Sequence, residues 1–211
     1  MPSAVIGQIV FAVFIMMAVR RSWDGMSDAE IVELVRGGTT NAFEVLVNRY
    51  DRRLHGVVQK MLHDREETAD VVQDAFIRAY GALETFDTSR AFYTWICRIA
   101  MNLALNVIEK QKRRATDSLD EKAEDTGFEP ISDADTTAMT HEAELTRAVT
   151  AALDDLPDGM REVFVLRVYD ELSYDEIAET LEIPRGTVMS RLSRARTKLQ
   201  ADLGAFIDQE D

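Results

Sequence analysis

After residue 26, apolar residues recur at steps of three and four along most of the chain, which places them on one face of an α-helix. This spacing predicts a long helix over Phe43–Leu62 and another over Val71–Leu83. A third helix begins at Phe92 and runs past Ile108 into a basic cluster. Thr85–Arg90 is a polar interruption between the second helix and the third.

A second series of apolar stripes follows residue 144 and predicts four shorter helices. Ser27–Glu30 and Ser173–Glu176 both have the capping-box pattern that begins a helix. Turns are expected at residues 157–159 and at Ile183-Pro184. The four expected helices are Leu145–Leu156, Arg161–Tyr169, Ser173–Leu181 and Arg185–Leu203. Since no segment has a strand pattern, we expect an all-α fold.

The two helical blocks are separated by a strongly acidic segment. Asp117–Glu144 contains ten acidic residues and one lysine, and Gly127 and Pro130 interrupt it. Such a composition is typical of a solvated, flexible linker. We therefore divide the chain into an apolar extension (1–25), a first helical domain (26–115), an acidic linker (116–143) and a second helical domain (144–206).

Composition narrows the possible functions. The 211 residues carry 24 Lys and Arg against 38 Asp and Glu, a net charge of −14, which excludes a simple basic protein that coats nucleic acid. Cys97 is the single cysteine, and the three histidines lack metal-ligand spacing, so neither a disulfide nor a metal site is expected. No phosphate-binding loop or catalytic motif is present in the sequence. We expect a reduced, cytoplasmic protein that is not an enzyme and needs no cofactor.

The first 25 residues allow three interpretations. Ala4–Val19 is almost wholly apolar, but it is short for a membrane-spanning helix, and Arg20 and Arg21 follow it rather than precede it, unlike a signal peptide. The first interpretation is that the segment is a membrane tether or interfacial helix. A second interpretation is that the true start of the chain is Met26, so that residues 1–25 over-extend it. A third is that the segment has some other role.

The last predicted helix reverses the charge of the chain. Pro184–Gln200 carries five basic residues and no acidic one, directly after a tight turn between two short helices. This is the layout of a helix-turn-helix, whose second helix enters the major groove of DNA. Arg191 and Arg194 share a face, and arginine suits bidentate contact with guanine or phosphate. The alternative is a basic, solvated helix on an ordinary bundle.

Aromatic side chains cluster where the third helix begins. Phe92, Tyr93 and Trp95 precede a basic run at Lys110–Arg114, and aromatic and basic side chains together can bind single-stranded DNA. The alternative is that the aromatics are core and that the cations only complement the helix dipole. Asp70 and its polar neighbours are equally consistent with a solvated face.

Two pairs of motifs resemble bacterial RNA polymerase sigma factors. Asp70–Tyr80 (DVVQDAFIRAY) and Ala91–Asn102 (AFYTWICRIAMN) resemble conserved region two, most closely that of sigma-E-like members of the extracytoplasmic-function (ECF) group. Leu156–Arg167 and Ser173–Arg196 resemble region four. The resemblance covers about Ser27–Leu203 and implies a region-two helical bundle joined by the linker to a region-four helix-turn-helix.

The resemblance implies a subunit that binds core RNA polymerase and starts transcription of a stress or envelope regulon from promoter DNA. The residues implied to bind the clamp helices of the largest polymerase subunit are Asp70, Gln73, Asp74, Phe76 and Tyr80. Those implied to bind and melt the −10 element are Thr85, Phe86, Asp87, Arg90, Phe92, Tyr93, Trp95, Arg98, Asn102, Lys112, Arg113 and Arg114. Those implied to read the −35 element are Arg185, Gly186, Thr187, Val188, Met189, Ser190, Arg191, Arg194 and Arg196. Region four would also contact the polymerase flap.

The resemblance further implies an anti-sigma factor, often membrane-bound, that holds the protein inactive. Many relatives carry Arg or Lys where this chain has Met189, so the −35 preference cannot be copied from them. Two other classes stay open: a helix-turn-helix regulator that is not a polymerase subunit, and a membrane-tethered signalling protein that uses Ala4–Val19. The first leaves Asp70–Asn102 without a role.

Overall fold

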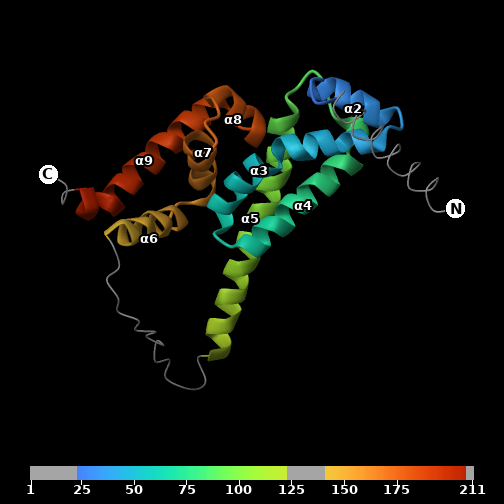
Figure 1. Ribbon diagram of the computed structural model, residues 1–211. Helices are drawn as coiled ribbons and strands as arrows, with labels where there is room; N and C mark the ends of the chain where they lie inside the picture. The colour runs from blue at the N-terminus through green and yellow to red at the C-terminus, as the bar shows by residue number, and fades with distance from the viewer. Residues whose placement is uncertain (1–22, 123–140, 208–211) are drawn as a thin grey trace.

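The computed structural model describes residues 23–122 and 141–207, and within these ranges the protein is helical with no strand (Figure 1). The all-α prediction is confirmed for this part of the chain. Our expectations for residues 4–19 and for most of the acidic linker fall outside the described residues. Among the described helices, none is long and apolar enough to cross a membrane.

The first block is built on three packed helices. These are α3 (Phe43–Leu62), α4 (Arg65–Gly81) and α5 (Phe92–Lys122), and α2 (Asp28–Arg36) covers one end of α3. Two 3₁₀ turns, η1 (Thr40–Ala42) and η2 (Leu83–Thr85), complete the block. Its core consists of fully buried apolar side chains at the predicted helical spacing: Leu46, Leu54, Val58, Met61, Val72, Ile96 and Met101.

The second block contains α6 (His141–Asp154), α7 (Asp158–Val168), α8 (Tyr174–Leu181) and α9 (Arg185–Ile207). The long helix α9 contacts each of the other three helices. Where α6 crosses α9, a small separate core forms from Ala152, Leu153, Leu156, Ala195 and Leu199.

Both predicted capping boxes are present. The Ser27 and Ser173 side chains each accept a hydrogen bond from the backbone N–H three residues on, and Glu30 and Glu176 accept from the serine backbones in return. Two boundaries differ from expectation. Residues 157–159, predicted as a turn, lead directly into α7, whose first residue is Asp158, and α5 continues to Lys122, past our boundary at residue 115.

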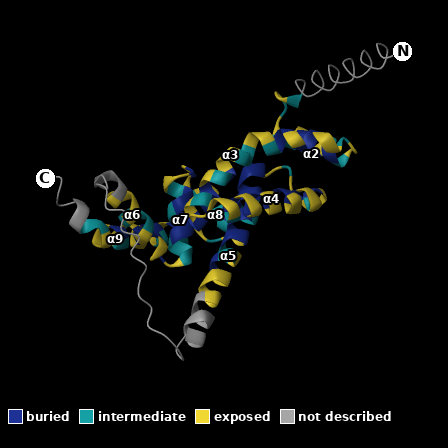
Figure 2. Ribbon diagram, turned by 60° about the horizontal axis from the view of Figure 1, so that its bottom comes forward, coloured by how far each residue is buried: buried dark blue, intermediate teal, exposed yellow. Residues whose placement is uncertain are grey.

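The two blocks pack against each other, which the sequence pattern did not predict. Helix α7 lies against α3, and α8 lies against α5 (Figures 1 and 2). One continuous cluster of buried apolar residues includes side chains of both blocks. Arg161 of α7 is only 4% exposed and donates a hydrogen bond of 3.1 Å to the carbonyl of Met61, at the carboxyl end of α3. This bond satisfies a carbonyl that the helix itself leaves unpaired.

Candidate nucleic-acid interface

Helices α8 and α9 form the expected helix-turn-helix. The turn between them has Glu182 in the left-handed region, with φ of 51°, and the N–H of Thr187 donates to the carbonyl of Pro184 at 2.8 Å as α9 begins. Ile177, Val188 and Leu192 are at most 2% exposed and hold the two helices together. Val188, which the resemblance placed among the −35 residues, is therefore a core residue.

Outside this buried stripe, α9 is exposed and basic. Arg185, Met189 and Arg196 recur at helical spacing along one flank of the stripe, and Met189 is 53% exposed. The other exposed residues of the predicted −35 set are Gly186, Ser190 and Arg194. Arg185 has an acidic neighbour, Asp175 of α8, at 3.5 Å. The fold thus gathers most of the predicted −35 residues on one accessible helix face, and Thr187 lies partly exposed beside them.

Arg191 is placed differently from its neighbours. It is half-buried, and its guanidinium lies so close to α7 that a Cβ built on Gly159 would come within 2.9 Å of it. It also faces Glu162, a carboxyl that is 8% exposed. Burial raises the pKa of Glu162 to about 7, although Arg191 acts to lower it. Arg191 therefore has a packing role within the second block.

The predicted melting aromatics lie in a buried cluster at the start of α5. Phe86 and Phe92 are 4% and 0% exposed, and their ring centroids are 5.6 Å apart in an edge-to-face arrangement. Trp95 lies 4.7 Å from Phe86 and is partly exposed, whereas Tyr93 is 5% exposed. Of the three neighbouring aromatics, Trp95 alone has substantial access to solvent in this arrangement.

The polar loop before α5 is fixed by an arginine that sequence reasoning missed. The guanidinium of Arg36, at the end of α2, donates to the carbonyls of Leu83 at 2.8 Å and of Phe86 at 2.5 Å. Asp87 accepts from the N–H of Ser89 at 2.9 Å and closes a tight turn. Since the loop carbonyls turn inward to Arg36, the side chains of Thr85 and Asp87 are left on the exposed side of the loop.

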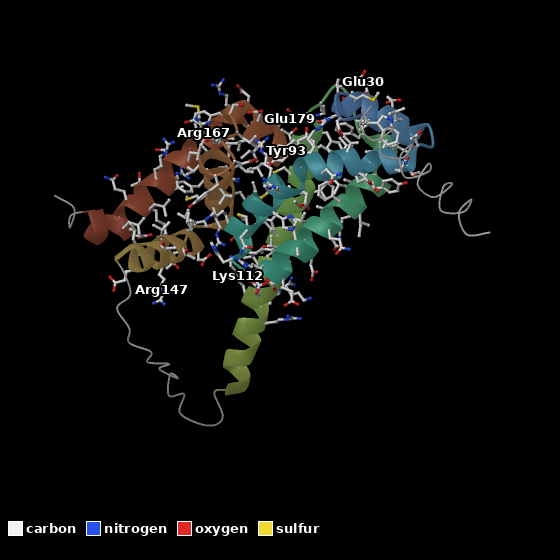
Figure 3. The ribbon with its side chains drawn as sticks, viewed as in Figure 1. Glu30, Tyr93, Lys112, Arg147, Arg167 and Glu179 are labelled. Carbon is white, nitrogen blue, oxygen red and sulfur yellow. The ribbon has the colours of Figure 1, made fainter. Side chains whose placement is uncertain are left out.

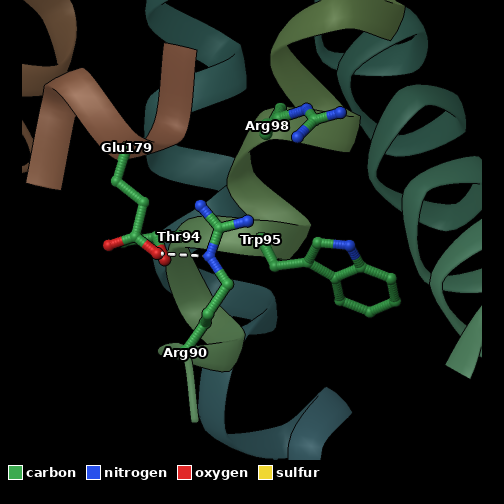
Figure 4. A pocket seen from close by; sticks show the side chains of 5 residues that line it. All are labelled: Arg90, Thr94, Trp95, Arg98 and Glu179. Atoms are coloured by element: carbon green, nitrogen blue, oxygen red, sulfur yellow. Dashed lines mark hydrogen bonds and ion pairs between the residues drawn. The ribbon is translucent and has the colours of Figure 1, made fainter. Parts of the chain in front are cut away.

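Arg90 and Arg98 do not lie free on the surface. Arg90 donates to Glu179 of α8 at 2.8 Å (Figure 4), and Arg98 pairs with Glu182 at the end of the same helix. Figure 3 labels Tyr93 on α5 and Glu179 on α8, both in the region where the two blocks meet. The C-terminal block thus covers part of the surface predicted to bind the −10 element.

A third contact of this kind was not predicted at all. Asp170, between α7 and α8, is 5% exposed and accepts hydrogen bonds from Arg53 at 2.6 Å and from the Tyr93 hydroxyl at 2.7 Å. The guanidinium of Arg53 also lies 3.9 Å from the centroid of the Tyr93 ring. Neither Arg53 nor Asp170 carries a local sequence signal, because only the tertiary packing brings them together.

The remaining residues of the predicted −10 set line the exposed length of α5. Asn102 is exposed, beside a hollow of about 300 Å³ that Trp95 and Arg98 also line. Farther along, Lys112 bonds Asp158 of α7 at 2.8 Å, while Arg113 and Arg114 are exposed. Lys112 thus lies where α5 adjoins α7, and Arg114 lines a groove that α5 shares with α4.

The outer face of α4 carries the predicted polymerase-binding residues. Asp70, Gln73 and Asp74 are exposed, and a groove of about 380 Å³ between α4 and α5 includes both aspartates. Phe76 is 7% exposed and belongs to the core. Tyr80 is 43% exposed, and next to it Ile77, which the resemblance did not single out, is 59% exposed. An exposed isoleucine beside an exposed tyrosine is typical of a protein-binding face.

Comparison with known protein families gives two matches. A model described as Sigma-70 region 2 matches residues 46–114, and one described as Sigma-70, region 4 matches residues 146–199. The first covers α4, most of α3 and the body of α5, and the second covers the helix-turn-helix.

Individual proteins match over most of their length. The RNA polymerase sigma-H factor of Pseudomonas aeruginosa is 38% identical over 183 residues, which are 83% of this chain and 93% of the relative. The ECF RNA polymerase sigma-E factor of Escherichia coli K12 is 38% identical over 177 residues, 81% of this chain and 91% of the relative. A solved structure of CnrH in complex with the cytosolic domain of CnrY matches with a TM-score of 0.63 and 29% identity, over 84% of this chain and 97% of that one.

Proposed function

The chain belongs to the sigma-70 family of RNA polymerase sigma factors, within the ECF group, and from that premise we propose how its surfaces divide the work of a transcription initiation factor. The observation that carries the proposal is the occurrence of both regions, in order, in one chain that covers more than nine-tenths of its curated relatives. The first block binds core polymerase and the −10 element, and the second block reads the −35 element.

For polymerase binding we assign the outer face of α4, with Asp70, Gln73, Asp74 and Tyr80. Acidic and amide side chains around an exposed apolar pair suit a partner that offers basic and apolar groups. We add Ile77 to this polymerase-binding face because its exposed side chain does not contribute to the core of the chain. We assign the buried Phe76 to packing α4 in the core rather than to direct contact with polymerase.

For promoter recognition we assign the exposed face of α9 to the major groove of the −35 element. Arginine and serine side chains at helical spacing fit direct readout and phosphate contact. Trp95, Asn102 and the loop with Asp87 and Arg90 are assigned to the −10 element, where an unpaired base would stack or bond. The buried pair Phe86 and Phe92 shapes this site from below.

A regulatory partner belongs to the same proposal. CnrH, a structural relative, is solved in complex with the cytosolic domain of CnrY. We propose that this chain is likewise held by an anti-sigma factor, which covers its polymerase-binding and DNA-binding faces. Since core polymerase and promoter DNA are its partners, we place its action in the cytoplasm.

The competing function, a helix-turn-helix regulator outside polymerase, accounts for α8 and α9 only. It gives no role to the match over residues 46–114 or to the exposed face of α4. It predicts a dimer on palindromic sites, whereas the proposed subunit binds an asymmetric promoter as part of a polymerase complex.

The deciding experiment combines the purified chain with bacterial core RNA polymerase and fragmented genomic DNA of its source, and maps the 5′ ends of the RNA. We expect discrete start sites that share two upstream elements. The matched control is Arg194→Ala, which should fold normally but lose starts that depend on the upstream element. Starts no different from core polymerase alone, in a reaction where a known sigma factor is active, would contradict the proposal.

A further inference from the structure

The segment before the recognition helix carries six acidic residues and no basic one between residues 170 and 182. Five of the six are used in two ways. Glu176 completes the capping box of α8, and Asp175 faces Arg185 of α9, so these two act within their own block. Asp170, Glu179 and Glu182 reach across to the first block.

Each of these three carboxylates meets an arginine of the first block. The Asp170 carboxylate lies 2.6 Å from Nε of Arg53, and the Glu179 carboxylate lies 2.8 Å from Nε of Arg90. Glu182 pairs with Arg98. We call this set of three pairs the interdomain clasp. The same guanidinium groups would bind phosphate oxygens with the same charge-assisted geometry.

The clasp also controls access to Tyr93 and to the surface around it. Tyr93 is 5% exposed because Asp170 and the guanidinium of Arg53 cover it. A small hollow remains open between α5 and α8, lined by Arg90, Thr94, Trp95, Arg98 and Glu179 (Figure 4). A DNA strand cannot follow this surface while α8 lies against α5.

We propose that the carboxylates of Asp170, Glu179 and Glu182 occupy the positions that promoter-strand phosphates take on the first block, so that the free chain is closed and Arg53 is a further DNA-backbone contact. This rests on the proposed function, since it names a regulation of the same −10 surface. Promoter DNA and the three carboxylates then compete for the same arginines, Arg53, Arg90 and Arg98, and cannot bind them at the same time.

The energetics suit a closure that can be reversed. Glu179 and Glu182 are 36% and 56% exposed, and solvent-exposed ion pairs stabilise a contact only slightly. Burial raises the pKa of Asp170 even though Arg53 and Tyr93 bond its charged form. Desolvation of the buried Asp170 therefore offsets part of that pair's attraction, although the Arg53 side chain is 45% exposed. Polymerase binding to the two blocks at separate places can open such a contact.

The first test removes the exposed half of the clasp. The full chain with Glu179→Gln and Glu182→Gln is compared with Glu66→Gln and Glu109→Gln, a control that changes net charge equally at exposed positions on α4 and α5. Fluorophores on Asn48→Cys and Thr197→Cys, on exposed sites of α3 and α9, report the distance between the blocks. The native Cys97 will not compete for label, because it is fully buried and burial raises its pKa to about 12.

We expect the clasp variant to shift toward long distances and the control to stay short. Affinity for a fluorescein-labelled, mixed-sequence single-stranded DNA should rise about five- to tenfold in the clasp variant alone. A wild-type chain that is already open, or a clasp variant that keeps the short distance and the wild-type affinity, would overturn the proposal.

Two further variants separate closure from DNA contact. Arg98→Glu should open the chain, and adding Glu182→Arg should close it again by the reversed pair while DNA affinity stays low. In the opened chain, Arg53→Ala should reduce the salt dependence of DNA binding by about one phosphate contact, a slope change of roughly 0.7. An unchanged salt dependence in Arg53→Ala would show that Arg53 does not contact DNA. If the chain with Arg98→Glu and Glu182→Arg stays open, the ion pairs do not hold the two blocks closed.

The outcome is separable from that of the proposed function. A chain that initiates transcription at discrete sites but shows no closure overturns only the clasp. A chain that closes as described but never directs polymerase to discrete starts overturns the function instead, and with it the meaning assigned to the closure.

Discussion

The hydroxyl of Tyr93 donates a hydrogen bond of 2.7 Å to the carboxylate of Asp170, and both side chains are at most 5% exposed. The two residues are 77 positions apart, on different blocks and on either side of the acidic linker. A residue predicted to melt DNA is therefore bonded, in this arrangement, to a carboxylate of the block that carries the recognition helix.

Removing that hydroxyl tests the bond directly. Tyr93→Phe should lower the free energy of unfolding of the full chain by about 1–2 kcal/mol, because the buried Asp170 loses a donor. Tyr50→Phe is the matched control, since the Tyr50 hydroxyl bonds Asp28 within the first block. Urea denaturation should show destabilisation in both variants, but only Tyr93→Phe should lengthen the distance between labels on α3 and α9.

Glu162 predicts a pH dependence of stability. Its pKa is raised by burial from 4.5 to about 7, so between these values the folded chain keeps a proton that the unfolded chain releases. The free energy of unfolding should therefore fall as pH rises from about 4.5 to 7, by about 1–3 kcal/mol from this group. The charged residues that line the cavity beside Glu162 are Arg98 of α5, Glu182 at the end of α8 and Arg191 of α9.

The check is denaturant unfolding from pH 4.5 to 8 for the wild type and for Glu162→Gln. The difference between the two curves isolates Glu162 from Asp170, whose pKa burial also raises. The variant should be flatter over this range. A difference that is constant with pH would show that Glu162 keeps an ordinary pKa in the folded chain.

Substitutions of Arg191 and Arg194 should have different effects, although sequence analysis assigned both residues the same role in −35 recognition. Arg194→Ala removes an exposed side chain and should weaken binding to a −35 element by about 1–3 kcal/mol with unchanged stability. Arg191→Ala should also destabilise the second block, because its guanidinium packs against Gly159 and faces the buried Glu162. Duplex binding and thermal unfolding of each variant distinguish the two roles, and equal loss of stability would contradict the distinction.

Ile77→Asp should weaken assembly with core polymerase by about tenfold or more, because an exposed isoleucine beside Tyr80 offers apolar area to a partner. Asp74→Ala, in the adjoining groove, should act in the same direction. Leu145→Asp is the matched control, an exposed aliphatic residue of α6 outside this face. Binding is measured by displacement of a labelled sigma factor from core polymerase, and equal affinity of Ile77→Asp and wild type would remove this residue from the docking face.

Local signals were enough to predict much of the site. Helical spacing predicted the apolar faces of α3, α4 and α9, and serine–glutamate patterns predicted where α2 and α8 begin. The basic run after Pro184 was found because charge at helical spacing is visible in sequence. Exposure was not visible in the same way. Val188 and Phe76 lie inside motifs of predicted contact residues, yet packing buries both.

By itself, the sequence determined the helices, their order, the helix-turn-helix and the family, because each depends on residues within a few turns of one another or on motifs in order. Only the tertiary structure decided how the two blocks meet. Whether Arg53 faces Asp170, and whether Arg98 faces Glu182 or solvent, depends on residues 117 and 84 positions apart. The periodicity of a helix specifies which face is apolar, but not which distant charge lies opposite its polar face.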